Sequence, residues 1–140
     1  MTTGDVFHGK TEVEKSDRDR KIMQTILIII NDAPYGSERP FNALRLAIKL
    51  NEQDAEPVAV NVFLMSDAVT CALAKQAPTE GYDIQQMVEI VLAQGGEVKL
   101  CKTCCAARGL TALPLIEDVV IATLDDLAEW TLAADKVFTF

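Results

Sequence analysis

The chain has 140 residues and a formal net charge of −8, and 49% of its residues are hydrophobic. This length corresponds to about one domain with one core. An acidic chain lacks the clustered basic surface that binding to nucleic acids or anionic membranes requires, so we expect neither kind of partner. The longest uninterrupted apolar run, residues 26–30, is too short to cross a bilayer. Together these features predict a cytoplasmic protein without a membrane span.

Residues 1–21 are polar and highly charged, and they show almost no periodic apolar positions. This composition predicts a flexible extension, followed by a single domain over residues 22–140. The extension holds the only histidine, His8, to which we assign no role, and it does not have the pattern of a secretory signal. The four cysteines are therefore expected to serve redox, sulfur or metal chemistry rather than structural disulfides.

The first half of the domain predicts two strands, each followed by a helical stretch. Residues 25–30 are a β-branched apolar run, and a turn with proline and glycine leads into a helical pattern over residues 41–48. Residues 57–65 are almost entirely apolar, which is typical of a strand in a sheet that is covered on both faces. A short helical stretch, residues 68–75, follows this second strand.

The second half continues the alternation. Apolar residues at helical spacing predict a long helix that begins at Ile84 and stops at Gly95. Thr123 and Asp126 have the spacing of a capping box at the start of the last helix. The remaining predicted elements are strands at residues 97–101, 118–123 and 136–140, a helical turn at residues 103–108, and a helix over residues 124–134.

This alternation of strands and helices favours right-handed crossovers and parallel pairing. The sequence therefore predicts a three-layer α/β/α domain with a mostly parallel, five-stranded sheet. Ligands and reactive groups of such sheets gather beyond the carboxyl ends of the strands. Residues 31–39, 65–67 and 101–108 follow predicted strands, so we expect them to face one crevice.

Three of the four cysteines lie within five positions at the end of a predicted strand. Cys101 closes the strand, and Cys104 and Cys105 fall in the first turn of the next helix if Thr103 is its N-cap. Free backbone N–H groups and the helix dipole at such a position favour a thiolate. This arrangement predicts a nucleophilic sulfur.

Two cations strengthen that prediction, because Lys102 and Arg108 place positive charge near the cysteines. Four interpretations remain open: a persulfide carrier, a dithiol redox pair of Cys101 and Cys104, a metal site, and buried inert thiols. We expect no metal or other cofactor, because neither a second cysteine pair nor a suitably spaced histidine is present. Cys71, which lies in a predicted helix without nearby cations, is interpreted as a structural thiol.

The turn over residues 31–39 is a weaker candidate. It lacks the glycine-rich and lysine-containing patterns of nucleotide-binding loops, and its proline and glycine are explained by turn geometry, with Ser37 as a possible helix cap. Its position after a strand nevertheless makes Asn31, Tyr35 and Arg39 candidates for lining the crevice.

Five ordered segments carry a resemblance to a known family. They are "NDAPYGSERPFNALRLAIKL", "VFLMSDAVT", "EGYDIQQM", "VKLCKTC" and "TLDDLAEWTLAADKVFTF". Taken together, they resemble the DsrE/DsrF-like family, and most closely its YchN-type branch. The resemblance covers residues 23–140 and leaves the N-terminal extension outside.

The resemblance implies a flavodoxin-like subunit that assembles into a homotrimer or homohexamer, with its cysteine sites near subunit interfaces. It also implies a link to sulfur relay. In the sulfurtransferase branch, a cysteine at the end of a strand carries a persulfide, and this position matches Cys101. Cys104 matches the second cysteine that is typical of the YchN-type branch. This paired arrangement departs from the single cysteine of relay subunits, so a disulfide can compete with sulfur transfer.

The sequence thus leads to the hypothesis of a sulfur-relay protein that accepts and passes on persulfide sulfur through Cys101. Cys104 would be a resolving or modulating thiol, and Lys102 and Arg108 would lower the pKa of Cys101. Sulfur donor and acceptor proteins are the expected partners, besides further copies of the chain. The alternatives are a thiol-disulfide redox switch and a non-catalytic module that binds a small ligand or a partner.

Overall fold

The structure is a computed structural model that describes residues 23–140. The predicted extension and His8 lie outside the described residues. The described part contains a five-stranded sheet in the order β4-β3-β2-β1-β5, and every strand pair in it is parallel. The strands are β1 (Gln24–Ile30), β2 (Val58–Leu64), β3 (Glu97–Cys101), β4 (Val120–Ala122) and β5 (Lys136–Thr139). The predicted three-layer α/β fold is confirmed.

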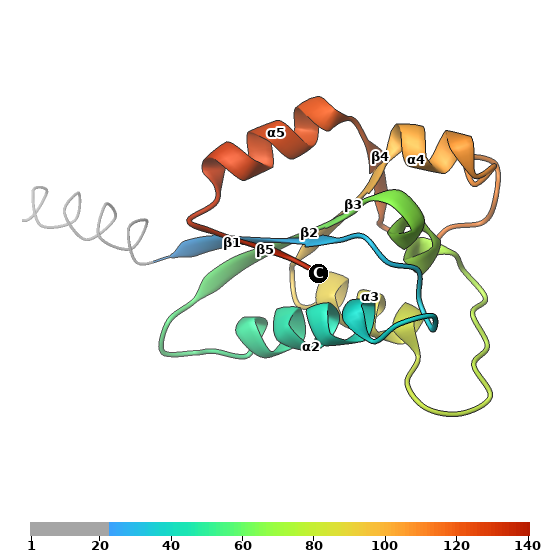
Figure 1. Ribbon diagram of the computed structural model, residues 1–140. Helices are drawn as coiled ribbons and strands as arrows, with labels where there is room; N and C mark the ends of the chain where they lie inside the picture. The colour runs from blue at the N-terminus through green and yellow to red at the C-terminus, as the bar shows by residue number, and fades with distance from the viewer. Residues whose placement is uncertain (1–22) are drawn as a thin grey trace, which may run out of the picture.

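Helices cover both faces of the sheet (Figure 1). The helices α2 (Arg39–Asn51) and α3 (Ile84–Ala93) lie below the sheet in that view, and α4 (Lys102–Ala107) and α5 (Leu124–Ala133) lie above it. Two predicted boundary signals hold: Gly95 follows α3 with a φ of 97°, and Thr123 and Asp126 form a capping box at α5. Because the strands are parallel, their carboxyl ends all lie at the same end of the sheet, and α4 begins there.

The core is formed by apolar side chains of the central strands and of the helices below the sheet. Phe63 on β2 and Leu27 on β1 are fully buried, as an apolar strand between two helical layers requires. Burying a side chain of this size contributes roughly 1.5–3 kcal/mol. Further fully buried side chains are Ile28, Ile30, Val62, Leu64 and Leu100 in the sheet, and Ala43, Leu44, Ala47, Ile84, Val88 and Val91 in the helices.

Two predicted local details are wrong. The helical stretch expected at residues 68–75 is a 3-10 helix, η1 (Ser66–Ala72), that begins and ends earlier. It ends there because Leu73 is extended and forms an isolated antiparallel bridge with Leu115. The N-cap of α2 is Glu38 rather than Ser37, although the Ser37 hydroxyl still accepts the backbone N–H of Arg39 at 3.3 Å.

Helix α5 covers its side of the sheet incompletely. None of its residues is buried, and Leu124 and Leu132 are 68% and 89% exposed. The half-buried Trp130 is its main anchor, since its ring packs edge-on against Phe63 and lies under the ammonium group of Lys99. Part of the apolar surface of α5 is therefore left open.

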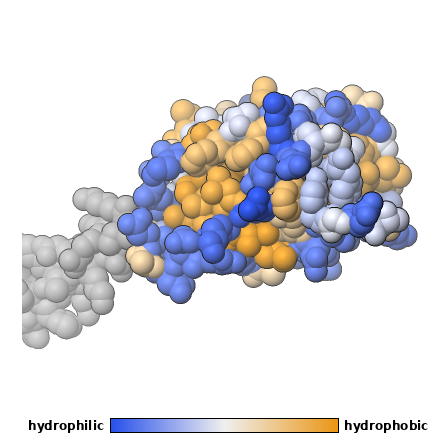
Figure 2. Space-filling view, turned by 60° about the horizontal axis from the view of Figure 1, so that its bottom comes forward, coloured by the Kyte–Doolittle hydropathy of each residue, from blue (hydrophilic) through white to orange (hydrophobic). Residues whose placement is uncertain are grey.

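The opposite side of the molecule also exposes apolar surface. Figure 2 turns the α2 side toward the viewer and shows a hydrophobic patch among hydrophilic residues. A groove of about 360 Å³ lies where α2 meets β1 and the edge strand β5, and its apolar lining includes Ile26, Leu46, Leu50 and Phe138. All four residues of β5 are exposed.

Candidate functional site

Cys101 occupies the junction between β3 and α4. It ends the strand and is itself the N-cap of the helix, because its Sγ accepts the backbone N–H of Cys104 at 3.4 Å. The predicted N-cap, Thr103, is therefore wrong: Thr103 lies inside the first turn, and its hydroxyl is 3.3 Å from the Cys101 Sγ. The sulfur thus takes the part that a serine or aspartate oxygen usually plays.

Hydrogen bonds dominate the electrostatics of this sulfur. Burial raises the pKa of Cys101, but hydrogen bonds from the side chains and backbone amides of Cys104 and Thr103 outweigh burial, and the net pKa is below the usual value. Lys102, which is exposed, and Arg108 are not among these main influences. The predicted cations Lys102 and Arg108 therefore affect the pKa of Cys101 less than the hydrogen bonds from α4 do.

Cys104 has the opposite tendency. Burial raises its pKa, and the hydrogen bond to Cys101 raises it further. The backbone N–H of Ser66, which donates to the Cys104 Sγ at 3.2 Å, and the charge of Arg108 act in the other direction without reversing the shift. Two neighbouring thiols whose pKa values are driven apart have different roles. Cys101 is therefore the more readily ionised thiol of the pair, and Cys104 holds its proton more tightly.

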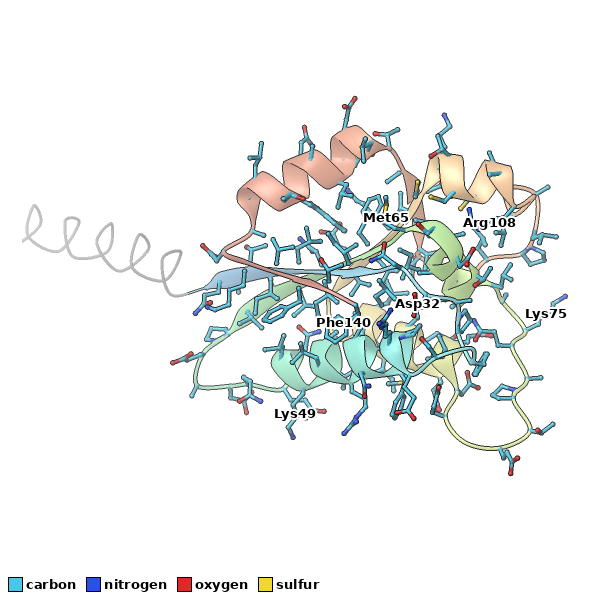
Figure 3. All side chains as sticks on the ribbon, viewed as in Figure 1. Asp32, Lys49, Met65, Lys75, Arg108 and Phe140 are labelled. Carbon is cyan, nitrogen blue, oxygen red and sulfur yellow. The ribbon has the colours of Figure 1, made fainter. Side chains whose placement is uncertain are left out.

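Arg108 links the two elements that carry these groups. Its Nη2 and Nε lie 2.8 Å and 3.0 Å from Oδ1 of Asp67 on η1, and its Nη1 donates to the backbone carbonyl of Cys104 at 3.2 Å. Figure 3 shows Arg108 beside α4 and η1, at the end of the sheet that carries the thiols. Its charge acts on Cys104 and Cys105.

The other two cysteines are buried thiols. Cys105 and Cys71 are fully buried. Burial raises the pKa of Cys71 to about 12, and burial together with the neighbouring sulfurs raises the pKa of Cys105. Among residues 23–140, no group of three or more cysteine, histidine or acidic side chains is arranged to hold a metal ion.

The three candidates from the β1–α2 turn form contacts elsewhere. The Asn31 side chain donates to the carbonyl of Phe140 at 3.3 Å, and Arg39 pairs with Asp32 at 3.5 Å. The Tyr35 hydroxyl donates to the Gln76 side chain at 2.7 Å and borders a hollow of about 400 Å³ beside residues 76–80. The structure places these residues around the turn and the chain end, rather than in contact with Cys101.

Sequence reasoning missed the parts that Ser66 and Asp67 play. Both lie in the segment 65–67, which the sequence placed at a strand end without assigning a role to any side chain. Ser66 has a φ of 52°, in the left-handed region that residues other than glycine rarely adopt. This turn directs its N–H toward the Cys104 sulfur, and no pattern of residue types reveals such a turn.

Comparison with known proteins identifies the family. A model of the DsrE/DsrF-like family matches residues 24–140. The chain belongs to the DsrE/DsrF-like family. Protein YchN of Escherichia coli is 60% identical over 118 residues, which cover 84% of this chain and all of YchN. An uncharacterized protein of Methanopyrus kandleri is 37% identical over 118 residues, or 84% of this chain and 95% of that protein.

Solved structures agree with this assignment. The crystal structure of YchN from E. coli matches this DsrE/DsrF-like chain with a TM-score of 0.81 over 84% of the chain and all of YchN. A protein of unknown function from Bacteroides thetaiotaomicron matches with a TM-score of 0.62 at 16% identity, covering 84% and 95% of the two chains, which shows a shared fold. Within residues 23–140, no helix is long and apolar enough to span a membrane.

Proposed function

We propose that this DsrE/DsrF-like protein is a sulfur carrier, in which Cys101 accepts sulfane sulfur as a persulfide and passes it to an acceptor thiol. The placement of the Cys101 Sγ carries the proposal, since the sulfur ends the interior strand β3 and is hydrogen-bonded by the Cys104 amide and by Thr103. Burial raises the pKa of Cys101, but these hydrogen bonds outweigh burial and hold the pKa below its usual value. A larger thiolate fraction makes the sulfur a better nucleophile at neutral pH.

The transfer takes two displacements at sulfur. The Cys101 thiolate attacks the sulfane sulfur of a polysulfide or of a donor protein's persulfide, and the donor's S–S bond breaks with its electron pair on the donor sulfur. An acceptor thiolate then attacks the outer sulfur, and Cys101 leaves as a thiolate. A lowered pKa favours this second step as well, because a thiol of lower pKa is the faster leaving group.

A thiol-disulfide redox switch is the second candidate. It is favoured by the position of the two cysteines on one helical turn, where the backbone N–H of Cys104 donates to the Cys101 Sγ at 3.4 Å. In that case an oxidant joins them in a reversible disulfide, and no sulfur is retained. A non-catalytic binding module is the third candidate, with the hollow beside Tyr35 as its ligand site.

Mass spectrometry of the intact protein separates these candidates. The reduced protein is incubated with inorganic polysulfide, freed of excess donor, and analysed with peptide mapping. One added sulfur atom on Cys101, absent from Cys101→Ser and present in Cys71→Ser, supports the carrier. Loss of two hydrogens in the wild type, with no sulfur added to Cys104→Ser, supports the redox switch, and an unchanged mass in both proteins supports the binding module.

We further propose that the chain assembles into a homotrimer or homohexamer in the cytoplasm, where thiols stay reduced. The exposed apolar side chains of α5 support this proposal, with Leu132 89% and Leu124 68% exposed and no residue of the helix buried. Apolar side chains that a helix leaves uncovered are available for contact with another protein. Donor and acceptor proteins would dock at the thiol edge of the sheet, where Cys104 is only partly buried.

A further inference from the structure

Cys104 is held from two sides by η1, the 3-10 helix that follows β2. Its Sγ accepts the Ser66 N–H at 3.2 Å, and its carbonyl accepts from Arg108, whose guanidinium is paired with Asp67 at 2.8 Å. We propose that the Asp67–Arg108 pair positions Cys104 to release sulfur carried by Cys101 as hydrosulfide, with formation of a Cys101–Cys104 disulfide. This inference rests on the proposed persulfide on Cys101. It adds a reaction within the same chain that releases the carried sulfur.

The geometry favours Cys104 as the attacking group. The backbone N–H of Cys104 donates to the Cys101 Sγ at 3.4 Å, so the two cysteines lie on the same helical turn and the second thiol is near the first. Cys105 is fully buried, and the Cys71 Sγ lies near the carbonyl of Asp32, in the β1–α2 turn. Cys104 is therefore the thiol that the fold keeps beside Cys101.

Loading of Cys101 changes what surrounds Cys104. In the empty protein, burial and then the hydrogen bond to Cys101 keep the pKa of Cys104 high. When Cys101 Sγ is bonded to a second sulfur, it is no longer a thiolate, and its contribution is removed. The Ser66 amide and the Arg108 charge, which favour the Cys104 thiolate, remain. We therefore expect the pKa of Cys104 to fall when Cys101 carries sulfur.

The step balances without a further reagent. The Cys104 sulfur attacks the Cys101 Sγ and forms the new S–S bond, while the bond between Cys101 Sγ and the outer sulfur breaks. The outer sulfur takes the electron pair of that bond, keeps the persulfide proton and leaves as HS⁻, and the proton of Cys104 has passed to water before the attack. The sulfane sulfur is reduced, and the two cysteine sulfurs are oxidised to the disulfide. A small-molecule thiol reduces this disulfide before the next load.

The Asp67–Arg108 pair acts here through position. One carboxylate oxygen faces two guanidinium nitrogens, which fixes the guanidinium so that its third nitrogen meets the Cys104 carbonyl. Loss of the carboxylate frees Arg108 and loosens α4 from η1, and with it the contact between Ser66 and Cys104. Displacement of a reacting group by about 1 Å can slow a reaction roughly a hundredfold.

The test follows sulfur release after loading. Reduced protein is loaded with inorganic polysulfide, excess donor is removed, and HS⁻ and the protein mass are followed with time. We expect the wild type to lose its extra sulfur as HS⁻ and to gain a disulfide between Cys101 and Cys104. Cys104→Ser should keep the sulfur. Asp67→Ala should release the sulfur at about one tenth of the wild-type rate or at a lower rate. Glu52→Ala, which breaks the exposed Lys49–Glu52 pair at the C-terminal end of α2, is the matched control and should behave as wild type.

The outcomes separate this inference from the proposed function. A wild type that loads and keeps its sulfur overturns the release step and leaves the carrier proposal standing. A wild type that never loads overturns both. Equal release by Asp67→Ala and wild type overturns the role of the Asp67–Arg108 pair, and release by Cys104→Ser overturns the role of Cys104.

A pH profile tests positioning apart from general stability. In the Cys101→Ser background, the rate of Cys104 alkylation is measured against pH. Removal of Cys101 should shift this profile to lower pH, and adding Asp67→Ala should shift it back upward. Asp67→Glu, which keeps the charge, should restore the lower position in a protein that folds as well as wild type. An unchanged profile in Asp67→Ala contradicts the positioning role.

Discussion

The backbone amide of Ser66 donates a hydrogen bond to the Cys104 Sγ at 3.2 Å, although the two residues lie 38 positions apart. The contact joins the turn after β2 to the helix after β3. The strands β2 and β3 are parallel neighbours in the sheet. Ser66 has a φ of 52° in the turn that makes this hydrogen bond. The thiol pair is therefore shaped by a strained turn on the adjacent strand as well as by its own helix.

That turn should tolerate glycine and reject a β-branched residue. Ser66→Gly keeps the N–H and suits a positive φ, so its free energy of unfolding should stay within about 0.5 kcal/mol of wild type. Ser66→Val should lower the free energy of unfolding by about 1–2 kcal/mol, because left-handed backbone is costly with a branched side chain. Urea denaturation measures both, and an equally stable Ser66→Val would contradict the assigned strain.

The Thr103 hydroxyl should help to keep Cys101 ionised. Burial raises the pKa of Cys101 and hydrogen bonds from Cys104 and Thr103 lower it, so Thr103→Val should move the pKa upward. Alkylation of Cys101 should then be slower at neutral pH and reach the wild-type rate at high pH, where the thiol is ionised in either case. Thr131→Val on α5, whose hydroxyl bonds the Leu127 carbonyl, is the control. Identical pH profiles for Thr103→Val and wild type would rule out this role.

The buried thiol of Cys71 should make stability depend on alkaline pH. Burial raises its pKa from 9.0 to about 12, so the folded state holds the proton more tightly than the unfolded state. This contribution is fully present below pH 9 and is lost as pH rises from there toward 12. Cys71→Ala should be less stable than wild type at pH 7, and the difference should narrow above pH 9. A constant difference across that range would contradict the effect.

The open face of α5 should be needed for assembly. Leu132 is 89% exposed, so Leu132→Asp costs little in the free energy of unfolding of a single subunit, by about 0.5 kcal/mol or less. In an assembly that covers α5, the same change buries an unpaired charge and should give smaller species. Light scattering after gel filtration measures this. A wild type that runs as a monomer would contradict the assembly itself.

Much of the fold follows from patterns that local physics dictates. The five strands were predictable because each is a short apolar or β-branched run, and parallel pairing follows from the helices between them. The capping box at Thr123 was visible because it depends on residues three positions apart. These signals are local, and the sequence displays them directly.

The site was predictable only in part. The position of Cys101 at a strand end could be predicted, but its role as N-cap could not, because Thr103 is by type the better cap. The Asp67–Arg108 pair joins residues 41 positions apart and depends on the register of β2 against β3. Arg108 was expected to lower the pKa of Cys101. In the structure its guanidinium donates instead to the Asp67 carboxylate and to the Cys104 carbonyl.

The most direct test of the carrier proposal follows labelled sulfur through the protein. Reduced protein is loaded from polysulfide that carries isotopically labelled sulfur, separated from the donor, and mixed with a small acceptor thiol. Wild type and Cys104→Ser should both carry the label on Cys101 directly after loading, and Cys104→Ser, which cannot release it as hydrosulfide, should pass it to the acceptor as a labelled persulfide. Cys101→Ser should carry none. Label that never enters Cys101, or that reaches the acceptor equally well in Cys101→Ser, would contradict the proposal.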